Sequence, residues 1–292
     1  MNSKRLVGAV FVIITVVAVI LSSGFLLQCT LNNTDDADLT ANNKPNDIDL
    51  IQSNQMKQIN EDNAHGPAVM DDEALNSRLN DIFGSATYSI AVIDLTDGTI
   101  IVDVDADDTF FAASVYKLFI GYSMIRAVEN NNLSWDSYLY GMPLRQCFEK
   151  MLVESNNECP VAWLTSISSN ERETEQAQQF GAYSTSFLEY PVVTTASDAA
   201  RLLERLYRHE GISDDSAEYM LDCLSRQIYR SGIPAGLKNI GEVQDKVGFL
   251  DGVLNDTAVI YTPKGDYVIS IFTVNASWPQ IAEAARILYE YL

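Results

Sequence analysis

The 292-residue sequence predicts an α+β fold in which strands from both ends of one domain build a single antiparallel sheet. Two observations lead to this prediction. β-rich runs occur near 88–103 and again over 243–274, and each group alone is too small to bury a sheet face. The region between them, from Ser114 to about Arg230, has a mostly helical pattern. We therefore expect a sheet flanked by helices, an inserted helical lobe, and a site in the cleft between lobe and sheet.

Residues 1–29 are expected to lie outside this domain. Lys4 and Arg5 precede a charge-free run over 6–28, which is long enough to cross a bilayer. The basic end would stay in the cytoplasm, so the rest of a single-pass chain would be extracytoplasmic at the cell membrane. A cleaved signal peptide and a lipoprotein signal at Cys29 are the alternatives. The run exceeds a usual signal core and Gln28 stands where a lipoprotein signal has a small residue, which favours an uncleaved anchor.

Residues 30–71 are rich in Asn and Asp and poor in large apolar side chains, so they predict a disordered stalk. Residues 72–292 would form the catalytic domain. The chain is 47% apolar, which is sufficient for a core.

Within that domain the elements follow in order. Acidic residues lead an apolar helical pattern over 72–83. Asp97-Gly98 predicts a hairpin turn between two strands. An amphipathic helix over 199–208 has its cap within 194–197. The other predicted elements are strands over 88–94, 99–103, 243–249, 257–262 and 267–274, and a closing helix over 281–292.

The sequence Ser114-Val115-Tyr116-Lys117 is the first candidate for chemistry. Positions i and i+3 of a helix share a face, so the Lys117 amine can reach the Ser114 hydroxyl. Large apolar residues flank both, and burial lowers the pKa of an amine toward the range of a proton acceptor. The only histidines are His65 and His209, so Lys117 is the candidate base. The simpler reading of such a short motif is a helix cap followed by a surface lysine.

Two further motifs follow. Ser155-Asn156-Asn157 lies between two helical runs, and Lys246-Val247-Gly248 lies near the end of a late strand, followed by Phe249. A Ser/Asn-rich turn is usually only a turn. A strand glycine marks either a bulge or a place where a ligand backbone comes close.

Taken together and in this order, the three motifs resemble those of the penicillin-recognising serine enzymes, the class A β-lactamases and D-Ala-D-Ala peptidases. The resemblance covers roughly 72–292. It implies the β-lactamase-like (DD-peptidase) fold and an acyl-enzyme mechanism.

The resemblance also implies roles. Ser114 would be the nucleophile, Lys117 its general base, and Ser155 the proton shuttle to the leaving nitrogen. Lys246 would add positive charge that keeps Lys117 neutral and attracts a substrate carboxylate. The substrate-binding residues would be Asn157, Gly248 and Phe249, with the N–H groups of Ser114 and Phe249 forming the oxyanion hole.

Three departures from the family pattern stand out. Asn156 replaces the usual Asp of the middle motif. Val247 replaces a Thr or Ser that donates to the substrate carboxylate, a hydrogen bond worth about 1.5–3 kcal/mol. No Glu-x-x-Leu-Asn segment lies between Asn157 and Thr194, and its glutamate activates the deacylating water. The glutamates present, which are Glu171, Glu173, Glu175 and Glu189, have no assigned role. A long-lived acyl-enzyme is therefore expected.

The cysteines indicate a possible disulfide, and the net charge limits the kinds of binding partner. Cys147 and Cys159 flank the middle motif at a spacing that two packed helices could close as an extracytoplasmic disulfide, which leaves Cys223 free, but the pairing stays open. The net charge of −21 argues against nucleic acid and anionic lipid. The chain lacks a His-rich ligand set, so we expect no metal. We also expect no cofactor, and a monomer.

Three functions remain. The first is a membrane-tethered serine hydrolase that is acylated by β-lactams and hydrolyses them slowly. The second is a D-Ala-D-Ala carboxypeptidase-like enzyme acting on peptidoglycan stem peptides, and the third is a non-catalytic penicillin- or wall-binding module. The first is favoured because every acylation residue is present.

Overall fold

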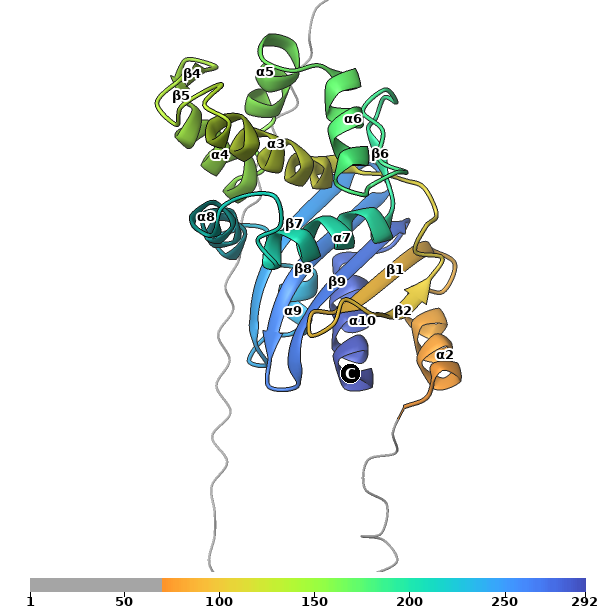
Figure 1. Ribbon diagram of the computed structural model, residues 1–292. Helices are drawn as coiled ribbons and strands as arrows, with labels where there is room; N and C mark the ends of the chain where they lie inside the picture. Colours follow the sequence, from red (N-terminus) through yellow and green to blue (C-terminus); the bar gives the residue numbers. More distant parts are fainter. Residues whose placement is uncertain (1–69) are drawn as a thin grey trace, which may run out of the picture. The chain divides into compact units, whose positions relative to one another are not determined.

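Five antiparallel strands form one sheet in the order β2-β1-β9-β8-β7 in a computed structural model that describes residues 70–292 (Figure 1). The pairing of β1 with β9 joins the two ends of the domain, with Thr87 opposite Val274 and Asp94 opposite Tyr267. The expected single sheet from both ends is confirmed. The strands are β1 (Thr87–Asp94), β2 (Ile100–Val104), β7 (Glu242–Leu250), β8 (Val253–Thr262) and β9 (Gly265–Val274).

Alternating side chains give the sheet two buried faces. On β1, Ile90 and Val92 enter one apolar cluster, whereas Ala91 and Ile93 enter the other. Successive residues of a strand point to opposite faces, and here both faces are covered by helices.

Helices α2 (Asp72–Phe83), α9 (Ile233–Gly236) and α10 (Trp278–Tyr291) pack together on one face. The bounds predicted for α2 are confirmed. Helix α10 begins three residues before the expected start because Ser277 and Gln280 form a capping box.

Helix α7 (Ala196–Tyr207) lies across β9, β1 and β8 on the other face, and α8 (Asp214–Ser225) lies beside β7 (Figure 1). The side chain of Thr195 accepts a hydrogen bond from the Asp198 N–H at 2.9 Å. This confirms the helix cap predicted within 194–197.

The inserted lobe consists of α3 (Lys117–Glu129), α4 (Leu144–Val153), α5 (Glu158–Ser166) and α6 (Asn170–Gln179), with α3 in contact with the other three (Figure 1). Two short ribbons complete it. They are β3 (Phe110–Phe111) paired with β6 (Val193–Thr194), and β4 (Tyr138–Leu139) paired with β5 (Met142–Pro143).

Strand β8 begins at Val253, earlier than the predicted Thr257. Gly252, at φ +75°, allows a tight turn that returns the chain at once. Asn255 and Asp256 are therefore buried residues of β8. The prediction left them out of the strand because polar residues interrupt the apolar pattern of a β-strand.

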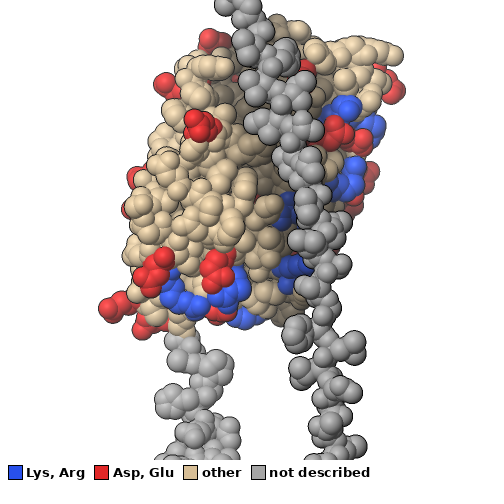
Figure 2. Space-filling view, turned by 180° about the vertical axis from the view of Figure 1, so that it is seen from behind, with Lys and Arg blue, Asp and Glu red and all other residues tan. Residues whose placement is uncertain are grey.

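Charged side chains on the face seen from behind gather in clusters of both signs, and a broad area between them is uncharged (Figure 2). An ion pair between Arg78 and Glu290 at 2.9 Å joins α2 to α10.

The predicted anchor over 1–29 and all but the last two residues of the predicted stalk lie outside the described residues. Within 70–292, no helix combines the length and apolar character that crossing a membrane requires.

Candidate active site

Ser114 lies in a single 3₁₀ turn, η1 (Ala113–Tyr116), directly before α3. Ala113 and Val115 are buried, whereas Ser114 is partly exposed. Ala113 adopts a left-handed φ of +44°, which is unusual for a residue with a Cβ. The turn thus presents a serine at the lobe–sheet boundary, as the motif predicted, although the α-helix proper begins only at Lys117.

The buried side chain of Asn255 fixes the two residues that lead into this turn, Phe111 and Ala112. Its Nδ2 donates to the carbonyl oxygens of Phe111 at 2.9 Å and Ala112 at 3.3 Å. The sequence did not predict this role, because Asn255 appears there only as a polar residue within an apolar run.

Gly248 of β7 faces the same turn. A Cβ at Gly248 would lie 2.6 Å from the Ala112 carbonyl oxygen, 2.9 Å from Ser114 N and 3.0 Å from Val115 N. Only glycine fits here. The backbone that comes close to Gly248 is that of the turn η1 and not a ligand's, and this approach brings the peptide that leads to Phe249 beside Ser114.

The Lys117 side chain is fully buried at the start of α3. Its Nζ donates to the Ser155 carbonyl at 2.5 Å, to Asn157 Oδ1 at 2.7 Å and to Ser155 Oγ at 3.2 Å. Burial lowers the pKa of Lys117 to about 7, and the nearby charge of Glu158 opposes this shift.

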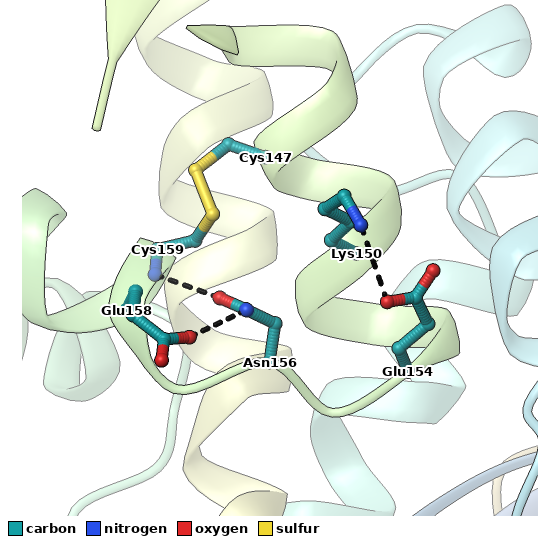
Figure 3. The surroundings of a disulfide bond; sticks show 6 residues. All are labelled: Cys147, Lys150, Glu154, Asn156, Glu158 and Cys159. Carbon is teal, nitrogen blue, oxygen red and sulfur yellow. Dashed lines mark hydrogen bonds and ion pairs between the residues drawn. A yellow bond between two sulfur atoms is a disulfide. The ribbon is translucent and has the colours of Figure 1, made fainter. Parts of the chain in front are cut away.

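The loop from Ser155 to Asn157 connects α4 to α5 in a fixed shape. Ser155 has a φ of +56°. Asn156 accepts from the Cys159 N–H at 3.0 Å and donates to Glu158 at 2.5 Å (Figure 3). Asn156 therefore braces the loop through its side chain, even though it stands where the family usually has Asp.

A disulfide between Cys147 of α4 and Cys159 of α5 closes this loop (Figure 3). The pairing left open by the sequence is thus the one the structure forms. Cys223 is free and buried.

Lys246 of β7 is also fully buried, and its Nζ donates to Ser155 Oγ at 3.0 Å and to the Val247 carbonyl at 2.8 Å. Burial, and then the charge of Lys117, lower the pKa of Lys246 to about 7. Both amines thus contact one hydroxyl, and two adjacent ammonium groups disfavour each other.

A buried acid pair adjoins Lys246. Asp245 is fully buried and pairs with Arg230 at 2.5 Å, while Asp256 accepts from the Ile233 N–H at 2.8 Å. Burial raises the pKa of Asp256 to about 7. Burial and the charge of Asp256 together raise the pKa of Asp245. Sequence reasoning missed these two residues, whose only signal is an acidic residue inside a strand.

The structure brings together Ser155, Asn157, Lys117 and Lys246 by direct hydrogen bonds. Within 70–292 no hydrogen bond joins the Ser114 hydroxyl to Lys117. Catalytic hydrogen bonds often tighten only when substrate binds, so transfer of the Ser114 proton to Lys117 stays a prediction.

None of the four unassigned glutamates hydrogen-bonds to this cluster in the described part of the chain. Glu171, Glu175 and Glu189 are exposed. Glu173 is buried inside the lobe, where it accepts hydrogen bonds from Ser123 at 2.7 Å, Trp163 at 2.8 Å and Ser168 at 2.6 Å. Its partners give it a structural role.

Residues 70–292 hold no group of three or more His, Cys, Asp or Glu side chains placed to bind a metal ion. The side chains at this site offer two hydroxyls, those of Ser114 and Ser155, and two amines of lowered pKa that both contact Ser155.

Several solved structures share this fold. The structure of PBP-A aligns with a TM-score of 0.68 at 20% identity, covering 74% of this chain and 94% of that chain. An ancestral class A β-lactamase aligns with a TM-score of 0.69 at 20% identity, covering 75% of this chain and 100% of that chain. A β-lactamase from Desulfarculus baarsii gives a TM-score of 0.66 at 19% identity, covering 76% and 98%.

No protein of curated function matches this sequence. A model of the beta-lactamase enzyme family matches residues 74–292, which is most of the chain. With the serine, the two lysines and the fold in place, the chain belongs to the beta-lactamase enzyme family.

Proposed function

We propose that this chain is a membrane-tethered serine hydrolase that is acylated on Ser114 by β-lactams and releases the product slowly. One observation carries the proposal. Two buried amines with pKa values of about 7, Lys117 and Lys246, donate to the same Ser155 hydroxyl beside the nucleophile turn. An amine with such a pKa is suited to accept a proton near neutral pH.

Acylation would proceed in two steps, attack on the lactam carbonyl and cleavage of the carbon–nitrogen bond. Ser114 Oγ attacks the lactam carbonyl carbon while its proton passes to neutral Lys117, and the N–H groups of Ser114 and Phe249 stabilise the oxyanion. The carbon–nitrogen bond then breaks, Ser155 Oγ gives its proton to the leaving nitrogen, and Lys117 returns the proton it took from Ser114 to Ser155. The result is an ester on Ser114 and a ring-opened amine.

Deacylation is the weak step in this proposal. It requires a base for the attacking water. None of Glu171, Glu173, Glu175 and Glu189 hydrogen-bonds to the cluster in the described part of the chain, and Glu173 is held inside the lobe. This favours slow turnover, and it keeps a D-Ala-D-Ala carboxypeptidase-like activity on stem peptides as the second candidate. The L158E mutant of PBP-A, a protein of the same fold, has been solved as an acyl-enzyme complex with penicillin G.

The anchor over 6–28 is part of the proposal, with the catalytic domain outside the cytoplasm as a monomer. The basic residues before the apolar run support this orientation. The Cys147–Cys159 disulfide also supports it, because such bonds persist in oxidising compartments. The test is whether the chain stays with membranes after an alkaline carbonate wash and is released when residues 1–29 are deleted.

The decisive experiment follows the intact mass of the full chain over time with penicillin G and with a chromogenic cephalosporin, beside Ser114→Ala. An adduct that forms and clears with product release supports a β-lactamase. A persistent adduct favours the wall peptidase. Labelling that survives in Ser114→Ala rules out the proposed nucleophile, and the absence of any adduct on the unmodified chain points to a binding module.

A further inference from the structure

A cavity of about 540 Å³ lies in the helical lobe, where α5 and α6 both contact α3. Its wall comes from the second half of α3 and the segment that follows it, from α5, from the α5–α6 connection and from α6. Most of the side chains that line it are polar. Its volume lies in the usual range of small-molecule sites.

This cavity is separate from the catalytic cluster. Helix α3 begins at Lys117 and α5 begins directly after Asn157, and these two residues contact each other at 2.7 Å. The cavity lies farther along both helices, starting at Ser123 on α3 and Trp163 on α5. Six helical residues span about 9 Å, so a ligand in the cavity would not touch Ser155 or its two amines.

The inner end of the cavity is buried, polar and fixed. Ser123 and Trp163 are each 2% exposed. The Ser123 hydroxyl, the Trp163 indole N–H and the Ser168 hydroxyl all donate to the carboxylate of Glu173. Because the hydroxyl protons are engaged there, the oxygens of Ser123 and Ser168 keep lone pairs that can accept hydrogen bonds from a ligand.

Two arginines line the cavity without an acidic partner among residues 70–292. They are Arg126 on α3 and Arg172 on α6. All but one of the other arginines in this range pair with a carboxylate. The exception is Arg145, which lies over the rings of Trp135 at 5.1 Å and Tyr219 at 5.2 Å. The two unpaired guanidinium groups that are not stacked between rings thus line the same cavity, in a chain of net charge −21.

Carboxylates near these arginines are held by other groups. Glu129, one turn after Arg126, accepts hydrogen bonds from the N–H of Ser213 at 2.9 Å and from its hydroxyl at 2.6 Å. Glu173 is enclosed by its three donors. Glu175 lines the cavity and is exposed, but it forms no ion pair with either arginine in the described part of the chain. An entering anion would therefore meet two guanidinium groups that no carboxylate contacts.

The polar side chains around the arginines suit an organic ligand. The guanidinium of Arg126 lies over the ring of Phe180 at 5.4 Å, which orients its plane and leaves the N–H groups at its edge available. Guanidinium groups bind carboxylate and phosphate through such paired N–H groups. Amide side chains can both donate to and accept from hydroxyl and amide groups, and four of them line the cavity, Asn130, Asn132, Gln176 and Gln179.

From these observations we infer that the cavity of Arg126, Trp163, Arg172 and Gln179 is a binding site for a small organic anion. A carboxylate or phosphate of the ligand contacts the two arginines, and a hydroxyl- or amide-bearing body contacts the amide side chains. A bare inorganic ion would leave most of the cavity and all four amides unused. This site does not depend on acylation of Ser114.

The test uses four probes that separate the anion from the body: glucuronate, glucose 6-phosphate, glucose and inorganic phosphate. The readout is the indole N–H signal of Trp163 in ¹H–¹⁵N NMR spectra of the full chain in detergent micelles. The chain has three tryptophans, and Trp163→Phe identifies the signal. We expect at least one of the two sugar acids to shift this signal with a Kd about tenfold below those of glucose and of inorganic phosphate. The tighter of the two acids identifies carboxylate or phosphate as the preferred anion.

Two variants assign binding to the arginines. Arg126→Gln and Arg172→Gln should each raise the Kd of the tighter acid about tenfold, because each removes a charged hydrogen-bond donor. Arg145→Gln is the matched control. It removes the same charge from an exposed arginine outside the cavity lining and should leave the Kd within about twofold. Three separate indole signals in each variant check that the domain is folded.

Four results would overturn the site. They are no shift of the Trp163 signal with either acid, glucose binding as tightly as the acids, inorganic phosphate binding as tightly as the acids, and equal weakening by Arg145→Gln and Arg126→Gln. The last would trace binding to the overall charge of the chain. Labelling of Ser114 by penicillin G in the same samples reports on the proposed function separately, so either proposal can fail without the other.

Discussion

Gly248 lies directly against the backbone of Ser114, so that a Cβ at residue 248 would approach Ser114 N to 2.9 Å. The oxygen of Ala112 would be closer still, at 2.6 Å. Backbone atoms cannot move aside as the end of a flexible side chain can. The strand β7 and the turn η1 can therefore lie this close because residue 248 has no side chain.

The Gly248→Ala variant should lower the rate of Ser114 acylation by about 100-fold, because it separates the two N–H groups expected to form the oxyanion hole. The measurement is the rate of adduct formation with penicillin G by intact mass. Near-UV circular dichroism on the same sample checks that the domain is folded. A folded variant that acylates within threefold of the unmodified rate would show that the strand can shift at no cost to the site.

The sequence predicted the parts of this site that depend on local spacing. Ser114 of η1 and Lys117 at the start of α3 are only three residues apart, and the strands and the α7 cap follow from side-chain patterns. Contacts across long separations are different. Ser155 and Lys246 are 91 residues apart, and only resemblance to a family suggested that they meet.

The residues that sequence analysis missed are buried polar residues whose contacts exist only in the folded domain. Asp245 and Asp256 appear in sequence as single polar residues within strands, and Asn255 as a polar residue after a turn. Their functions arise from burial and from partners on other elements, which no periodicity reports. Arg126 and Arg172 likewise come from different helices and line one cavity only in the folded lobe.

The pH dependence of acylation should follow Lys117. Its pKa is about 7 because burial disfavours the ammonium form, so acylation should rise as the pH rises through about 7 and the amine becomes neutral. The charge of Glu158 raises the pKa of Lys117. Glu158→Gln should therefore move the midpoint of the acylation profile to lower pH. The measurement is the acylation rate between pH 5 and 9, a range of about two units on either side.

Glu154→Gln is the matched control. Glu154 ends α4 directly before this loop and pairs with Lys150 at 3.4 Å (Figure 3). Its charge is not among those that shift the pKa of Lys117. Its removal should leave the midpoint unchanged. Equal shifts in the two variants would trace the effect to the overall charge of the domain and would contradict a specific role for Glu158.

Asp256→Asn should stabilise the domain more at pH 7.5 than at pH 3.3, both values being about half a unit outside the window between the unfolded and folded pKa values of Asp256. The folded-state pKa of Asp256 is about 7, above its ordinary 3.8. Between these values the unfolded carboxyl ionises while the folded one stays protonated, so this group lowers stability as the pH rises. Asparagine keeps an acceptor for the Ile233 N–H, which Asp256 now provides at 2.8 Å, and it cannot ionise.

Calorimetric melting temperatures of both proteins at the two pH values check this sign. The advantage of Asp256→Asn over the unmodified chain should increase with pH. A melting-temperature difference that is the same at both values would mean that Asp256 titrates alike in the folded and unfolded states. Asp222→Asn, at an exposed surface pair with Arg226, is the control and should show no such trend.

The Cys147–Cys159 disulfide closes a loop with a sequence separation of 12, and that loop carries Ser155 and Asn157. A bond of this span contributes about 3 kcal/mol by restricting the unfolded chain. The double variant Cys147→Ala/Cys159→Ala should therefore melt about 6–12 °C lower. It should also acylate more slowly, because the left-handed backbone at Ser155, at φ +56°, loses the constraint that helps to hold its hydroxyl between the two amines.

The Cys223→Ala variant is the control that distinguishes loss of the disulfide from loss of a buried cysteine side chain. Cys223 is buried but unbonded, so this change should lower the melting temperature less and leave acylation unchanged. Melting temperature and acylation rate measured on both variants distinguish stability from positioning. If the double variant melts lower but acylates at the unmodified rate, the disulfide stabilises the lobe only, and Asn156, through its contacts with Cys159 and Glu158, is sufficient to fix the loop.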